Sequence, residues 1–244
     1  TTCQLLEAAG GKCFFMIHET TDHIYARYEL VHAKFIVVDN HWAVVTSQNF
    51  GNASIPSDDK RNGTFGSRGV VVATDAEAVV NRIAAVFDAD CDPTHHHDIL
   101  RWNTGGYARY STPINPVDLY AGDATTTTVV FPDPLVLNGR FAFEVFTAPE
   151  GALRQRDTLL GLVARAQSGD TVYVEQLYEY ATWGTEPLVG PNLRLEAYIN
   201  AARRGARVRI LLNSGSFDQE VYDSTQNHTT VETVNQISRA ETLD

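Results

Sequence analysis

The stretch that most constrains the fold lies between residues 31 and 50, VHAKFIVVDNHWAVVTSQNF. Two apolar runs, residues 35–38 and 42–45, stand on either side of Asp39-Asn40. Short apolar runs separated by Asp and Asn are typical of a β-hairpin with a tight turn. The sequence therefore predicts two antiparallel strands that are joined at Asp39-Asn40.

The ends of this hairpin carry polar side chains. His32 and Lys34 are two residues apart, so in an extended strand they point to the same face. Ser47 and Asn49 follow the second apolar run. An imidazole can act as a nucleophile or a general acid or base, and a lysine, a hydroxyl and an amide can bind phosphate oxygens. These four residues are the candidate catalytic and phosphate-binding set; the alternative is a half-buried hairpin with a chance polar face.

The composition is that of an acidic globular protein. The chain has 244 residues, enough for one large domain or two ordinary ones. Its formal charge of −11 argues against a non-specific nucleic-acid binder, because such proteins usually present a basic surface. No apolar run reaches about 18 residues, so no transmembrane helix is predicted. No signal peptide is visible, and the compartment stays open, an extracellular one included.

Neither the cysteines nor the histidines form a metal-binding pattern. Cys3, Cys13 and Cys91 lack metal-type spacing, and their odd number leaves one Cys3–Cys13 or Cys13–Cys91 bridge open. Three consecutive histidines at 95–97 cannot all face one metal from a strand or a helix, so a solvated loop is favoured there.

The rest of the chain alternates between helical and strand patterns. Before residue 94 the sequence predicts a helix over 3–9 that ends at Gly10-Gly11, a strand over 12–17 and a loop over 51–67. It then predicts a buried strand over 69–73 and a helix over 76–89 capped by Thr74 or Asp75. Residues 94–149 look irregular, with strands at 129–131 and 141–146. After them it predicts helices over 153–166, 193–202 and 227–240 and strands over 171–177 and 208–212. The strand–helix–strand order favours parallel pairing of the last two strands.

The polar residues of the hairpin resemble the signature of the phospholipase D superfamily. That signature is His-x-Lys, four residues, Asp, six residues, Gly-Ser-x-Asn, and this chain has His32-Ala33-Lys34, then Asp39, then Thr46-Ser47-Gln48-Asn49. Every spacing fits. The single departure is Thr46 in place of glycine, which we expect to crowd the phosphate pocket slightly without removing a ligand.

The resemblance implies an α/β fold of mixed sheets flanked by helices, built from two repeats that each carry one motif. Residues 1–92 would form the C-terminal part of the first repeat, 93–149 an irregular connector, and 150–244 the N-terminal part of the second. No His-x-Lys follows residue 34. We therefore expect a fragment or processed chain that holds half of a catalytic pair, its second motif coming from the rest of the parent chain or from a second copy.

The resemblance also implies a mechanism, which is two-step phosphodiester cleavage without a metal or other cofactor. His32 would attack phosphorus and form a phosphohistidine. Lys34 and Asn49 would bind the non-bridging oxygens with support from Ser47, and Asp39 would be structural, at the turn.

A second departure concerns the carboxylate that often orients the histidine in this family. Shortly before the predicted strand 69–73, where such a carboxylate is expected, this chain has Arg68. Asp58 or Asp59 in the preceding loop would substitute for it, or Arg68 would contact the substrate phosphate.

Three function classes follow. The first is a phospholipase D-like phosphodiesterase that acts on phospholipid, slightly favoured by the acidic charge, or on nucleic acid as a nuclease, by hydrolysis or by transfer to an alcohol. The second is a non-catalytic binding module. Arg68 and Thr46 favour this class, and the intact His32 and Lys34 argue against it. A metal-dependent hydrolase that uses residues 95–97 is disfavoured by their spacing.

Overall fold

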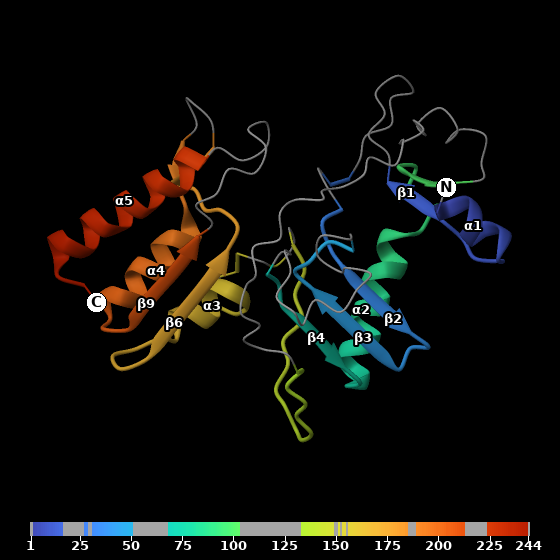
Figure 1. Cartoon of the computed structure of the whole chain (residues 1–244), viewed down its shortest axis with the longest axis horizontal. Helices are drawn as coiled ribbons and strands as arrows, with labels where there is room; N and C mark the ends of the chain where they lie inside the picture. Colours follow the sequence, from blue (N-terminus) through green and yellow to red (C-terminus); the bar gives the residue numbers. More distant parts are fainter. Residues whose placement is uncertain are drawn as a thin grey trace, which may run out of the picture. The chain divides into compact units, whose positions relative to one another are not determined.

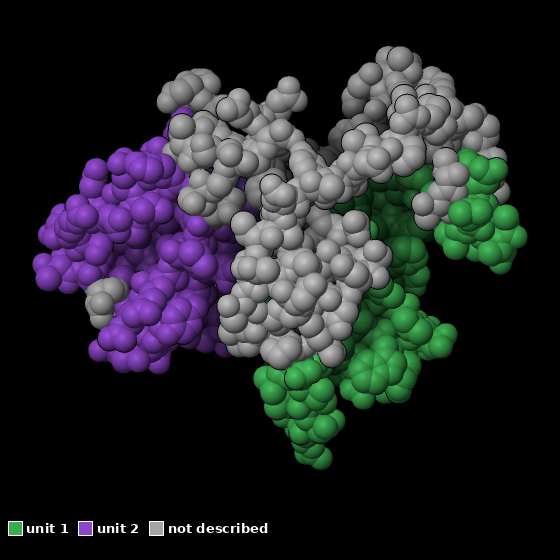
Figure 2. All heavy atoms as spheres, in the orientation of Figure 1, with its two compact units in different colours: residues 1–143 green, residues 144–244 purple. Residues whose placement is uncertain are grey.

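The chain folds as a mixed α/β protein, as the sequence predicted (Figure 1). The computed structural model describes residues 2–16, 27–28, 31–50, 68–102, 133–148, 151, 153–154, 156–184, 189–212 and 224–243. The chain divides into two compact units, unit 1 (residues 1–143) and unit 2 (residues 144–244), coloured separately in Figure 2. Within the described ranges, no helix combines the length and the apolar character needed to cross a membrane.

The predicted hairpin is present in unit 1. Strands β2 (Phe35–Val38) and β3 (Trp42–Thr46) pair antiparallel, and β4 (Val71–Thr74) joins the other edge of β3. Asp39 and Asn40 have φ angles of 52° and 51°, in the left-handed region that Asp and Asn tolerate. The His41 N–H donates to the Val38 carbonyl at 2.9 Å and closes the turn.

Helix α2 (Glu77–Asp90) packs along one face of this sheet. Val80 and Ile83 are its buried residues, and the Phe87 ring meets the Phe35 ring of β2 edge-on at 6.5 Å. The predicted cap was wrong, because Ala76 precedes the first residue of the helix. The Thr74 hydroxyl accepts a hydrogen bond from the Ala76 N–H.

The strand predicted over 69–73 is β4, but the prediction that it is buried was wrong. Val71 is 60% exposed and Val72 is 50% exposed. These two valines are exposed because β4 lies at the edge of the three described strands and has a neighbouring strand on one side only.

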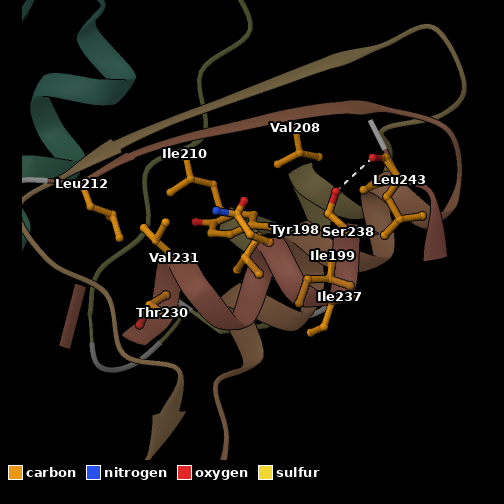
Figure 3. Close-up of a pocket in the computed structure, with 13 residues that line it drawn as sticks. Tyr198, Ile199, Val208, Ile210, Leu212, Thr230, Val231, Ile237, Ser238 and Leu243 are labelled. Atoms are coloured by element: carbon orange, nitrogen blue, oxygen red, sulfur yellow. Dashed lines mark hydrogen bonds between the residues drawn. The ribbon is translucent and has the colours of Figure 1, made fainter. Parts of the chain in front are cut away.

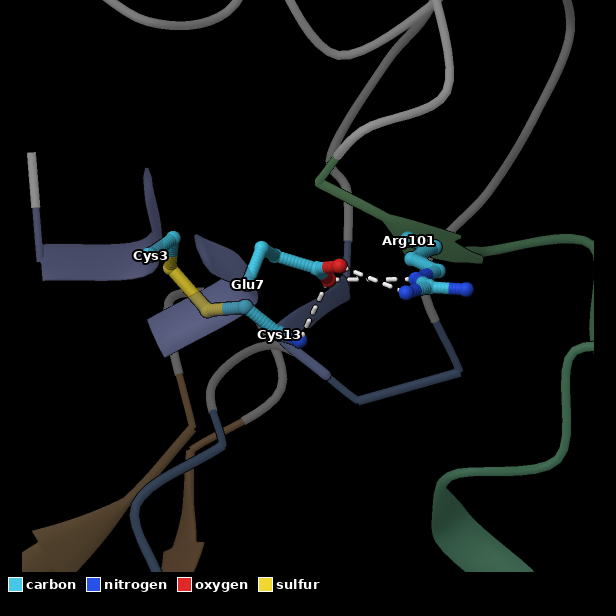
Figure 4. The surroundings of a disulfide bond; sticks show 4 residues. All are labelled: Cys3, Glu7, Cys13 and Arg101. Atoms are coloured by element: carbon cyan, nitrogen blue, oxygen red, sulfur yellow. Dashed lines mark hydrogen bonds and ion pairs between the residues drawn. A yellow bond between two sulfur atoms is a disulfide. The ribbon is translucent and has the colours of Figure 1, made fainter. Parts of the chain in front are cut away.

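A disulfide bond fixes the first helix of unit 1 (Figure 4). Helix α1 (Thr2–Ala8) ends before Gly10, whose φ of 90° suits glycine. Cys3 is bonded to Cys13, which selects one of the two bridges left open by the sequence. The Glu7 carboxylate accepts hydrogen bonds from the Cys13 N–H at 2.9 Å and from Arg101 Nε at 3.1 Å. Helix α1 is thereby tied to the antiparallel pair of β1 (Phe14–Met16) and β5 (Ile99–Arg101).

Unit 2 is a strand–helix–strand unit with flanking helices. Strands β6 (Thr171–Gln176) and β9 (Arg207–Leu212) are parallel, as predicted, and α4 (Leu193–Arg203) connects them. Helices α3 (Thr158–Ala164) and α5 (Ser224–Glu241) flank this pair, and a short ladder of β7 (Thr182–Trp183) and β8 (Gly190–Pro191) was not predicted. The core gathers Val163 of α3, Leu195 and Tyr198 of α4, and smaller residues around them.

Two predictions in the middle of the chain were wrong, and two more fall outside the described residues. No strand forms over 141–146, where Phe141 and Phe143 are exposed and no described strand lies alongside to pair. The helix predicted over 153–166 starts only at Thr158, whose φ of 62° prevents continuation toward residue 153. The loop 51–67 and the strand 129–131 are not among the described residues, and the predicted boundaries at residues 92 and 149 stay predictions.

A buried carboxylate holds the loop after β6 to the starts of α4 and α5. Glu179 is 1% exposed. Its Oε1 accepts hydrogen bonds from Asn192 Nδ2 at 2.7 Å and from an Arg194 terminal nitrogen at 3.0 Å. Its N–H donates to Asn227 Oδ1 at 2.9 Å, and its carbonyl accepts from the Thr230 hydroxyl at 2.8 Å. A buried charge is tolerated only when it is paired and hydrogen-bonded in this way.

Replacing Asn192 with alanine should destabilise unit 2 by about 2–4 kcal/mol. Asn192 caps α4 by accepting from the Arg194 and Leu195 N–H groups, and it also donates to Glu179, so both contributions are lost together. Urea unfolding followed by circular dichroism measures the effect. The matched control is Asn200→Ala, an exposed asparagine on the same helix, for which a change within about 0.5 kcal/mol is expected. Equal losses in both variants would show that the Glu179 network does not stabilise this unit.

Candidate functional site

The hairpin brings the candidate residues to the same end. The Thr46 N–H donates to the Lys34 carbonyl at 3.0 Å, so the pairing extends one residue beyond the start of β2. His32 precedes Lys34, while Ser47 and Asn49 follow Thr46. Because the two strands are antiparallel, all of them lie at the end of the hairpin that is remote from the turn at residues 39–40.

Side-chain alternation places Lys34 on the face of the hairpin that α2 does not cover. Phe35 and Val37 line a cavity of about 460 Å³ together with Phe87 of α2. Neighbouring side chains on a strand point to opposite faces, so Lys34 lies on the other face with Ile36, which is 46% exposed. The cavity between β2 and α2 is therefore not the place where Lys34 would meet a ligand.

The side chains of the candidate set are available to a ligand. His32 and Asn49 are exposed, and Lys34 is half-buried. No side-chain hydrogen bond or ion pair links any of these three to another residue in the part of the chain that the structure describes. Burial lowers the pKa of the Lys34 ammonium, because partial removal from water disfavours the charged form.

Ser47 is held in place by the neighbouring strand segment. The Val70 N–H donates to the Ser47 hydroxyl oxygen at 3.0 Å, and the Ser47 N–H donates to the Val70 carbonyl at 3.0 Å. A serine oxygen that accepts one hydrogen bond keeps its own proton to donate. Ser47 is thus oriented with a free O–H donor, as a phosphate ligand requires. Sequence reasoning missed Val70, since a backbone partner 23 residues away leaves no mark in the motif.

The residues around Ser47 form a close-packed bend. Thr46 is 8% exposed, and its hydroxyl accepts from the Gln48 N–H at 2.9 Å. A Cβ atom at Gly69 would lie 2.2 Å from the Gln48 side chain, so a larger residue there requires Gln48 to move. Thr46, the departure from the family signature, therefore has a structural partner of its own.

The orienting carboxylate for His32 is not found among the described residues. Arg68 is exposed, and Asp58 and Asp59 lie outside the described ranges. Hydrogen bonds from Thr94 lower the pKa of the Asp92 carboxyl, and so does the contact of His95 Nδ1 with Asp92 Oδ2 at 2.5 Å. Across the described ranges, no three His, Cys, Asp or Glu residues are grouped so that they could hold a metal ion.

Two comparisons with known sequences found no match to this chain. No family model matches it, and no curated protein matches it at a significant level. What the hairpin does is therefore inferred from its own residues and their geometry.

Replacing Gly69 with alanine should destabilise unit 1 by roughly 1–3 kcal/mol, as overpacking usually does. The added methyl group would displace Gln48 and loosen the two hydrogen bonds between Ser47 and Val70. Urea unfolding measures the loss. Gly139→Ala in the same unit is the control, because a Cβ there meets only Phe141 at an ordinary 3.6 Å. A Gly69→Ala variant as stable as the control would contradict the close contact.

Replacing Lys34 with methionine should leave unit 1 equally stable or more stable at neutral pH. Burial lowers the pKa of Lys34 below 10.5, so the folded chain holds this proton less tightly than the unfolded chain. The resulting penalty is full below the lowered pKa and disappears as the pH rises toward 10.5. The wild-type chain should therefore gain stability relative to the variant over that interval, as urea unfolding at neutral and alkaline pH measures.

The control for Lys34→Met is Lys12→Met, which removes an exposed ammonium in the same unit. The effect of Lys34 is measured as the difference between the two variants at each pH. A Lys34→Met variant that is clearly less stable than the wild-type chain at neutral pH would show that Lys34 has a structural role.

Proposed function

We propose that the hairpin of residues 31–50 binds a phosphodiester and that His32 attacks its phosphorus, as in the phospholipase D superfamily. One observation carries the proposal: an exposed imidazole and a half-buried ammonium stand at the same hairpin end as Ser47 and Asn49. Their spacing follows the family signature at every position except Thr46. The α/β elements on either side of the hairpin would then be parts of two phospholipase D-like repeats.

The first chemical step uses the residues of the hairpin. A nitrogen of His32 forms a bond to phosphorus, and the bond from phosphorus to the leaving alkoxide breaks. The negative charge on the non-bridging oxygens is stabilised by the Lys34 ammonium, the Asn49 amide and the Ser47 hydroxyl. Of these donors, Ser47 is oriented before the reaction, since the Val70 N–H already donates to its hydroxyl oxygen.

The second step releases the phosphoryl group from His32 to water or to an alcohol. It needs an acid that first protonates the leaving group and then acts as a base toward the acceptor. In this proposal a second His-x-Lys motif supplies that group, either from the rest of a parent chain or from a second copy.

The substrate that the proposal favours is a phospholipid. The phosphodiester itself is the same in a phospholipid and in a nucleic acid, so the motif does not distinguish them. The formal charge of −11 opposes a polyanion more than a zwitterionic lipid. A nuclease is the alternative substrate class.

The reaction can be tested with bis(p-nitrophenyl) phosphate in EDTA. Nitrophenolate leaves without protonation, so the first step proceeds even with one motif and gives at least a stoichiometric burst of colour. His32→Ala should abolish the burst. The control is His41→Ala, which removes an exposed histidine from the same hairpin.

The outcomes separate mechanism from substrate. Activity that survives in His32→Ala, that requires added metal, or that is lost equally in His41→Ala would contradict the proposed role of His32. Where the burst depends on His32, phosphatidylcholine vesicles and single-stranded DNA are compared as natural substrates, and faster cleavage of the DNA would reverse the preference for lipid.

A further inference from the structure

The three-stranded sheet of unit 1 has a second apolar face, opposite the face against which α2 packs (Figure 1). Side chains alternate along a strand, and residues paired across antiparallel strands point to the same face. The pairing of β2, β3 and β4 therefore places the following apolar side chains on this face, which we call the open face: Ile36, Val38, Trp42, Val44, Val71 and Ala73. Ile36 and Trp42 are each 46% exposed, and Val71 is 60% exposed. The open face is thus apolar and in contact with solvent.

Unit 2 shows a different arrangement of its sheet. Val208 and Ile210 of β9 lie against α4 and α5, so the apolar face of that strand is covered (Figure 3). The other face of β6 and β9 is exposed and carries charged side chains, namely Glu175, Arg207 and Arg209. An antiparallel sheet with one solvated face usually carries polar side chains there as well. The open face of unit 1 lacks them, and exposed apolar patches of this kind mark binding sites.

Lys34 lies on the open face, at the end of the hairpin that holds the candidate site. The Thr46 N–H donates to the Lys34 carbonyl at 3.0 Å, so the register continues beyond β2. Lys34, Ile36 and Val38 therefore form one row of side chains on the same face. The row spans about 13 Å, at about 3.3 Å per residue. None of the open-face residues is charged, so Lys34 supplies the only charge in this row.

A ligand that matches this row has an anion at one end and hydrocarbon along the rest. The Lys34 ammonium attracts a phosphate, whereas the aliphatic side chains favour the burial of apolar surface. An acyl chain also matches the row in length, because the hydrocarbon core of a bilayer is about 30 Å thick and one chain spans half of it. A nucleic acid matches poorly, since its successive phosphates need further cations along the strand.

We propose that the open face binds an acyl chain of a phospholipid whose phosphodiester lies at Lys34. The chain runs along β2, and its methylene groups pack on Ile36 and Val38. Its far end contacts Trp42, which is paired with Val38. The position of the phosphate rests on the function proposed above. The acyl contact adds the part of the substrate that distinguishes a lipid from a nucleic acid.

The probe is diheptanoylphosphatidylcholine, kept below the concentration at which it forms micelles and added to the full 244-residue chain. Binding is followed by NMR through the indole N–H of Trp42 and the methyl groups of Ile36. We expect saturable shifts at both residues and none at the indole of Trp183, which lies in unit 2. Glycerophosphocholine, which has the same phosphodiester without acyl chains, should not shift the Trp42 indole.

Three results of this titration would overturn the proposal. The first is the absence of saturable shifts with the lipid, as when another segment covers the open face. The second is an equal Trp42 shift with glycerophosphocholine, which would show that the acyl chain makes no contact. The third is tighter binding of single-stranded DNA at Trp42, which would identify a nucleic acid as the occupant.

Two valines of nearly equal exposure test which face binds the chain. Val38 is 49% exposed on the open face, whereas Val72 is 50% exposed and, being paired with Val45, points to the side of α2. Val38→Thr should weaken lipid binding by about twofold to fivefold, because one methyl group of apolar contact is lost. Val72→Thr should leave the affinity unchanged. Threonine suits a strand as well as valine does, so both variants should fold. Equal affinities in the two variants would overturn the assignment to the open face.

The result can be separated from the test of the reaction. Bis(p-nitrophenyl) phosphate has no acyl chain, so its burst reports on His32 alone, and the Trp42 shift requires no bond cleavage. A burst without a lipid-induced shift would overturn the acyl site and leave the proposed reaction standing. A shift without a burst would overturn the reaction and leave the acyl site standing.

Discussion

The register of β2 against β3 is the constraint on which the candidate site depends. In this register Val38 is opposite Trp42 and Phe35 is opposite Val45, and the Thr46–Lys34 hydrogen bond continues it. A slip of one residue would turn every side chain of a strand to the other face. The left-handed turn at residues 39–40 fixes the register, because few residue types accept positive φ at two successive positions. Asp39 therefore affects the candidate site by fixing the strand register, although it lies at the opposite end of the hairpin.

The polar residues of the candidate site are not arranged to stabilise the fold. Lys34 is half-buried without an ion pair among the described residues, and burial lowers its pKa. His32 and Asn49 are presented to solvent beside apolar strands. Glu179 in unit 2 shows the opposite arrangement, with each of its polar groups satisfied inside the protein. A carboxylate with this many internal partners stabilises a fold, whereas polar groups left without partners at one end of a hairpin are suited to a ligand.

Most of what could be predicted from the sequence was local. The hairpin and helices α4 and α5 follow from periodicity and from turn residues within about 20 positions. The parallel pairing of β6 with β9 is not local, and it followed from the strand–helix–strand order. The contacts that orient the site were not predictable. Val70 reaches Ser47 across 23 residues, and Asn227 reaches Glu179 across 48. The prediction of a strand over 141–146 was wrong for the same reason. Apolar alternation shows that a segment can form a strand, but it does not show which other segment would pair with it.

The central claim is that His32 forms a covalent bond to phosphorus, and peptide mapping tests it most directly. The chain is mixed with an aryl phosphodiester in EDTA and quenched in alkali, in which phosphohistidine survives. Tandem mass spectrometry then locates the phosphoryl adduct. We expect an acid-labile adduct on His32 and none in the Lys34→Met variant. An adduct on another residue, or none on the chain while the diester is cleaved, would contradict it.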